Sequence, residues 1–128
     1  MMKEHTMILK INADIIRKAY ATEGEILFDP CTYEFHRKSE TSLPEYVLPF
    51  PSVSETEMQR AYINTLNHRR LREHFSRLSD AECSAEFWCF YENSPLLPCF
   101  EDFEQQYQLE KIKIWCDENQ IAYYIDNR

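Results

Sequence analysis

The chain of 128 residues contains a single glycine, Gly24, and this scarcity constrains its fold and chemistry more than any other feature. Glycine-rich phosphate loops and dinucleotide-binding fingerprints need several glycines, because the backbone must approach a phosphate closely. The sequence therefore excludes both kinds of nucleotide site. The length fits one compact domain, 1–128, and 44% hydrophobic residues provide enough apolar surface for a core.

The N-terminal part, residues 1–53, is predicted to form a helix, a hairpin and a proline-rich loop. Asn12 suits the cap of a helix with apolar residues at helical spacing, and Gly24 suits a positive φ angle at its exit. Two strand-like runs, 25–28 and 33–36, flank an Asp-Pro sequence typical of a tight turn. Residues 38–53 are predicted to be a loop, because their prolines lack a backbone donor.

The second part, residues 54–128, is predicted to be mainly helical. Ser54 and Ser79 are each followed three residues later by glutamate, the pattern of a capping box. Asn67 is expected to cap a helix over 68–77. The sequence Asn93-Ser94-Pro95 is expected to end the next helix, and Pro98 fits the first turn of the last one. The positions expected to face inward are Met58, Ala61, Tyr62, Leu66, Leu71, Phe75, Leu78, Phe87, Phe90, Tyr91, Phe100, Phe103, Tyr107, Leu109, Ile112, Ile114 and Trp115.

The tail, residues 121–125, has the composition of a short edge strand, with the hairpin as its candidate partner. The predicted fold class is thus α+β and mainly α-helical. An N-terminal helix and a β-hairpin are expected to pack with a four-helix C-terminal region.

A series of short motifs covers residues 26–122 in a specific order. They are Leu27-Phe28-Asp29, Glu57-Met58 with Tyr62-Ile63 and Leu66, Leu71-Arg72-Glu73, Phe87 with Phe90, Phe100 with Phe103, Trp115, and Glu118-Asn119-Gln120-Ile121. This series resembles the bacterial uncharacterised protein family one-five-eight of the UPF series. The resemblance implies a mostly helical fold and no particular activity. Members tend to carry a Gly-Arg-Gly step and basic residues around the Phe-x-x-Phe pair, and residues 83–90 contain neither.

The formal net charge of −8 disfavours attraction to nucleic acid or to an anionic membrane. Residues 79–128 carry 11 acidic and 3 basic side chains. This half is expected to present a negative face that steers a basic protein partner, with Trp88 and Tyr91 as aromatic anchors beside Glu101 and Asp102. The sequence therefore favours a noncatalytic interaction or adaptor protein. A homodimer through surface aromatics, and a face that serves solubility alone, remain open.

The first alternative is a nucleic-acid-associated regulatory protein that uses the arginine-rich helix 68–77. Its candidate anion-binding residues are Arg69, Arg70, Arg72 and Arg77. The competing interpretation is a solvated helix face on which Glu73 and Arg77 form an ion pair. The acidic isoelectric point, about 5.0, favours the solvated face over a nucleic-acid surface.

The second alternative is an enzyme of unknown class. Zinc sites place ligands two to four residues apart, whereas Cys83 and Cys89 are six apart, as are His68 and His74, so we expect no metal or other cofactor. The thiol of Cys31, in the predicted turn, is the candidate reactive group. The five cysteines, without a signal peptide or membrane span in the sequence, favour a reduced cytoplasmic protein.

Overall fold

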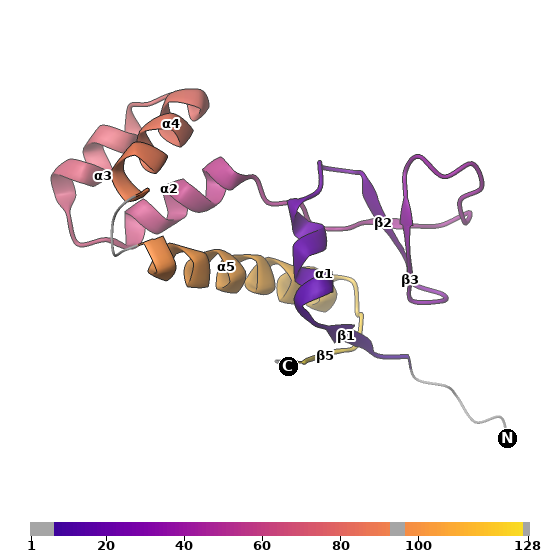
Figure 1. Ribbon diagram of the computed structural model, residues 1–128. Coiled ribbons are helices and arrows are strands. Elements are labelled where there is room, and N and C mark those ends of the chain that lie inside the picture. Colours follow the sequence, from indigo (N-terminus) through magenta and orange to yellow (C-terminus); the bar gives the residue numbers. More distant parts are fainter. Residues whose placement is uncertain (1–6, 93–96, 127–128) are drawn as a thin grey trace, which may run out of the picture. The chain divides into compact units, whose positions relative to one another are not determined.

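The computed structural model describes residues 7–92 and 97–126, and its fold class is α+β and mainly helical, as predicted (Figure 1). The chain divides into two compact units. Unit 1 comprises residues 1–52 and 108–128, and unit 2 comprises residues 53–107. The boundary falls inside the longest helix, α5 (Leu97–Glu118), so each unit receives one part of it. The arrangement of residues 1–128 as a single domain stays a prediction.

Unit 1 contains the predicted hairpin. Strands β2 (Ile26–Asp29) and β3 (Glu34–Arg37) pair antiparallel. The turn forms because the Asp29 carboxylate accepts a hydrogen bond of 2.8 Å from the backbone N–H of Cys31 and Tyr33 adopts a left-handed φ of 59°. Gly24 has the expected positive φ, 82°.

The loop prediction for residues 38–53 is wrong at one point. A short strand, β4 (Leu48–Pro49), pairs antiparallel with β2 and gives the strand order β3-β2-β4. Proline is tolerated there because β4 lies at the edge of the sheet, where a missing N–H donor costs little.

The predicted tail strand exists, but its partner differs from the expected one. Strand β5 (Tyr123–Ile125) pairs in parallel with β1 (Leu9–Ile11), not with the hairpin. Strand β1 escaped prediction because three residues alternating between buried and exposed give too short a period to recognise. Helix α1 (Ala13–Arg17) follows, capped by Asn12 as predicted, and continues as the short 3-10 helix η1 (Lys18–Tyr20).

Aromatic rings form the core of unit 1. The fully buried ring of Phe28 has its centroid 5.0 to 5.3 Å from those of Tyr33, Phe35 and Trp115. Phe50 adds edge contacts to Phe35 and Trp115 at 5.1 Å. Edge-to-face and tilted packing of this kind stabilises the sheet beyond the burial of apolar area alone.

Unit 2 consists of α2 (Glu55–Thr65), α3 (Arg69–Ser76), α4 (Asp80–Tyr91) and the first part of α5. Helix α2 lies against both α3 and α4. The buried residues of this core are Tyr62, Ile63, Phe75, Cys83, Phe87 and Phe100. Helical periodicity placed all of them inward except Ile63 and Cys83, which extend the same faces.

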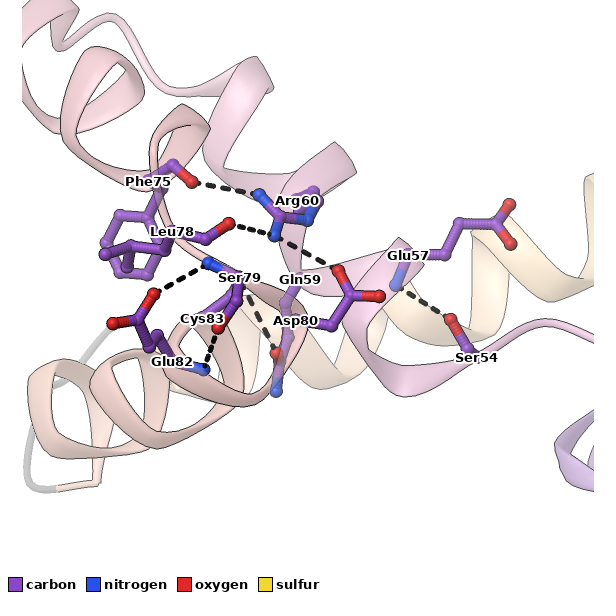
Figure 2. A network of polar contacts seen from close by, with 10 residues as sticks. All are labelled: Ser54, Glu57, Gln59, Arg60, Phe75, Leu78, Ser79, Asp80, Glu82 and Cys83. Carbon is purple, nitrogen blue, oxygen red and sulfur yellow. Dashed lines mark hydrogen bonds and ion pairs between the residues drawn. The ribbon is translucent and has the colours of Figure 1, made fainter.

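The helix caps depart from the predictions in two places. Ser79 and Glu82 form the complete capping box, and Ser54 accepts a hydrogen bond from the Glu57 backbone (Figure 2). The Glu57 carboxylate, however, accepts a hydrogen bond of 2.7 Å from the Tyr107 hydroxyl. His68, not Asn67, caps α3, because its ring nitrogen Nδ1 accepts from the Leu71 backbone at 3.1 Å. The predicted stop at residues 93–95 lies outside the described residues.

Two positions expected to face inward are exposed. The Phe90 side chain is 57% exposed and Ile114 is 52% exposed. In α5 the fully buried positions around Ile114 are Ile112 and Cys116, and Ile114 lies about 200° around the helix from Ile112. Phe90 lies on the flank of α4, where its ring centroid is 6.3 Å from that of Phe75.

Candidate functional site

The candidate site is an acidic, aromatic surface made by α4 and the beginning of α5. Residues 79–107 contain no Lys, Arg or His, and their seven carboxylates are Asp80, Glu82, Glu86, Glu92, Glu101, Asp102 and Glu104. Side chains from α2 and α3 contact two of them, since Arg60 lies 3.1 Å from Asp80 and His74 lies 2.7 Å from Glu86. We call this surface the α4–α5 acidic face.

Trp88 is held in one orientation on this face. Its indole Nε1 donates a hydrogen bond of 2.7 Å to the Glu55 carboxylate, and the same oxygen accepts from the buried Gln59 side chain at 2.9 Å. The indole ring packs against Phe87 and Phe100, at centroid distances of 5.5 and 6.1 Å. It nevertheless keeps 37% of its surface exposed. A large apolar ring is therefore presented to solvent with its orientation already fixed.

Apolar groups continue along α4 beside Trp88. Cys89 and Phe90 follow directly and both are exposed. Trp88 lies on the flank that meets the beginning of α5, whereas Phe90 lies on the flank that meets α3, as their ring contacts show. Exposed apolar side chains of α4 therefore lie beside the beginning of α5 and beside α3.

Three of the four predicted partner-binding residues, Trp88, Glu101 and Asp102, are exposed in the structure. Glu101 and Asp102 are exposed and follow Phe100, whose ring contacts Trp88. Tyr91 ends α4, and its side chain lies outside the described part of the chain. Sequence reasoning missed Phe90, which it placed inward, and Glu55, which fixes Trp88. The absence of basic residues over 79–107 is the signal in the sequence that marks the face most sharply.

The capping glutamate of α4 contributes permanent charge to this face. Hydrogen bonds from Ser79, first from its backbone and then from its side chain, lower the pKa of Glu82. The carboxylate therefore stays ionised to a lower pH than an ordinary glutamate does. Its negative charge lies in the first turn of α4, where it interacts favourably with the positive end of the helix dipole.

The side chains of the arginine-rich helix do not form one anion-binding surface. Arg69 pairs with Glu73 at 3.0 Å, so the predicted Glu73–Arg77 ion pair is wrong. Arg72 turns toward the end of α2 and donates to the carbonyl of Leu66. Arg70 and Arg77 are exposed at the surface.

Arg60, which sequence reasoning also missed, ties α2 to the corner between α3 and α4. Its guanidinium donates to the carbonyl oxygens of Phe75 at 2.9 Å and Leu78 at 2.7 Å, and contacts Asp80 (Figure 2). The sequence offers little indication of this role, because Arg60 is simply the one basic residue of the predicted helix.

The cysteines divide into two groups. Cys83 and Cys116 are buried, and burial raises the pKa of Cys83 and raises that of Cys116 to about 12, so both stay protonated at neutral pH. Cys31, Cys89 and Cys99 are exposed. A reactive role for Cys31 stays a prediction.

Within residues 7–92 and 97–126, no three or more His, Cys, Asp or Glu side chains come together as a metal site. None of the helices there combines the length and the apolar character needed to cross a membrane.

No family model, no curated protein and no solved structure matches this chain. The resemblance to the UPF-series family stays a prediction. The case for function rests on the geometry of the α4–α5 acidic face.

Proposed function

We propose that this protein is a noncatalytic interaction or adaptor protein of the cytoplasm that binds a basic protein partner on the α4–α5 acidic face. The observation that carries the proposal is Trp88, an exposed aromatic ring fixed by Glu55 and Phe100 within a stretch that lacks any basic residue. Tryptophan is among the residues most often found at the energetic centre of protein interfaces.

The fixed orientation of Trp88 supports an anchoring role. Ordering a mobile side chain at an interface costs about 0.5–1.5 kcal/mol. The hydrogen bond to Glu55 and the ring contacts already order the indole in the free protein. The free-energy cost of ordering this side chain when a partner binds is therefore smaller. A partner side chain that packs on the exposed part of the ring gains contact area on a rigid support.

The carboxylates support the choice of a basic partner. Glu101 and Asp102 are exposed and come directly after Phe100 in the sequence. The Phe100 ring contacts Trp88. A surface of one sign raises the association rate of an oppositely charged protein, and this effect weakens as salt screens the charges. We therefore expect fast, salt-sensitive association with a protein segment that carries Lys or Arg around an apolar residue.

The test is co-purification of the tagged full chain from nuclease-treated lysate at low and high salt. The charge-reversal variant carries Glu101→Lys and Asp102→Lys, and its matched control carries Asp117→Lys and Glu118→Lys. All four positions are exposed on α5, but only the first pair belongs to residues 79–107. We expect a protein at constant stoichiometry with the wild type and the control, and its loss with the first pair.

A second pair of variants tests the aromatic anchor. Trp88→Ala should lose the partner, whereas Tyr46→Ala, which removes a 62% exposed ring from unit 1, should keep it. Equal retention by both variants would exclude Trp88 as the anchor. Recovery of nucleic acid that nuclease removes would overturn the proposal. Capture of only a second copy would also overturn it, because two chains of net charge −8 do not provide the basic partner.

A further inference from the structure

A separate cavity lies in unit 2, on the side of α2 that meets α3. Its volume is about 250 Å³, and it is lined by Arg60, Ile63, Asn64, Arg72, Phe75 and Ser76. None of these residues belongs to the α4–α5 acidic face. The lining residues are two arginines, one asparagine and one serine, together with two apolar residues. We call it the two-arginine cavity.

Helix-end carbonyls hold both guanidinium groups in place. Arg60 donates to the carbonyls of Phe75 and Leu78, and Arg72 donates to that of Leu66. An arginine side chain carries five N–H donors. Each guanidinium therefore keeps donors beyond those that the structure uses, and its position is fixed by bonds to the backbone.

The charge around this cavity favours an anion. No carboxylate lines it. Asp80 contacts Arg60 with a side chain that is itself largely exposed, and Glu73 is paired with Arg69. Two arginines thus line a space whose other polar lining residues are the uncharged Asn64 and Ser76.

We propose that the two-arginine cavity binds a phosphate group, as the free ion or as a small phosphate monoester. Guanidinium groups match phosphate oxygens in geometry, and a dianion balances two of them where a carboxylate balances one. Sites for larger organic ligands usually measure about 300–1,000 Å³. The volume of about 250 Å³ therefore selects a small ligand, and the side chains of Ile63 and Phe75 provide an apolar wall for the carbon part of a monoester.

The experiment titrates the isotope-labelled full chain with inorganic phosphate or with methyl phosphate, and follows backbone amide signals by NMR at constant ionic strength. We expect saturable shifts centred on Asn64 and Ser76 with at least one of the two probes. Tighter binding of methyl phosphate identifies a monoester as the ligand. Equal or tighter binding of inorganic phosphate identifies the free ion.

The decisive variant is Asn64→Asp, which places a carboxylate in the cavity wall and leaves both arginines intact. Its matched control is Asn67→Asp, at an exposed position outside the lining. Repulsion at this short range should weaken binding at least about tenfold in the first variant and leave the second unchanged. Ser76→Asp repeats the test if circular dichroism shows that Asn64→Asp does not fold.

Two results would overturn the proposal. One is a set of shifts that grow with concentration of both probes without saturation. The other is saturable binding that is equally tight in Asn64→Asp or Ser76→Asp and in the wild type.

Discussion

The two compact units are stabilised by different means. In unit 1 the ring of Trp115 lies between those of Phe28 and Phe50, at centroid distances of 5.3 and 5.1 Å. In unit 2 the Trp88 ring packs against Phe87 and Phe100, and polar bonds from Arg60 connect the helix ends. The same residue type is therefore partly buried among aromatic rings in unit 1 and exposed in unit 2.

The largest effect should come from removing the more buried of the two indole rings, that of Trp115. Trp115→Ala should lower the free energy of unfolding by about 3 kcal/mol, because it leaves a void among Phe28 and Phe50. Trp88→Ala should cost about 1 kcal/mol, since its ring is already part exposed. Urea unfolding followed by circular dichroism measures both. Equal losses would contradict the distinction between the two tryptophans.

High pH should destabilise both units, because each contains an acidic group whose pKa is raised in the native state. Burial raises the pKa of Cys116 in unit 1 from 9.0 to about 12, and burial with the hydrogen bond to Glu57 raises that of Tyr107 in unit 2 from 10.0 to about 12. Between the ordinary and the raised values the native state binds more protons than the unfolded chain. The free energy of unfolding should therefore be independent of these groups below pH 9 and fall as the pH rises to about 12.

A thiol variant separates the two contributions. Cys116→Ala should remove the part of the decline that begins near pH 9 and leave the part due to Tyr107, which begins near pH 10. Unfolding curves at a series of pH values provide the measurement. An unchanged pH profile in Cys116→Ala would show that the pKa of the Cys116 thiol is not raised in the native state.

The elements that the sequence predicted are those with strong local signals. The hairpin followed from Asp29 and Pro30 between two strand-like runs, and the α4 cap followed from Ser79 and Glu82. Local hydrogen bonds determine both features, so a short window of sequence contains the needed information. The face of a long amphipathic helix is also local, which is why most of the unit 2 core was predictable.

The elements that the sequence missed depend on distant partners. Strand β1 exists because β5 pairs with it from the other end of the chain. Arg60 reaches carbonyls 15 and 18 residues away, and Tyr107 reaches Glu57 across 50 residues. Of the candidate site, Trp88 with Glu101 and Asp102 was predictable as exposed residues of an acidic stretch. The fixing of Trp88 by Glu55 was not, because it needs the packing of α2 against α4.

An intermediate effect should follow from cutting the polar ties of unit 2. Arg60→Met removes the bonds to the carbonyls of Phe75 and Leu78 and should lower the free energy of unfolding by about 2 kcal/mol. Arg69→Met, which removes only an exposed pair with Glu73, should cost less than about 0.5 kcal/mol. Urea unfolding compares the two. A negligible loss in Arg60→Met would mean that the bonds from Arg60 to the helix ends do not stabilise unit 2.

The smallest effect should come from replacing each tryptophan by phenylalanine, which keeps an aromatic ring at each position. Trp88→Phe leaves Trp115 as the sole indole, and Trp115→Phe leaves Trp88. Trp88→Phe should change the free energy of unfolding by no more than about 1 kcal/mol, because a ring remains in a part-exposed position. Fluorescence emission from Trp88 should lie at longer wavelength than that from Trp115, since 37% of the Trp88 surface is exposed to solvent. For the same reason, acrylamide should quench Trp88 more strongly. Equal quenching would show that Trp88 is enclosed in solution and would remove the anchor on which the proposed interface depends.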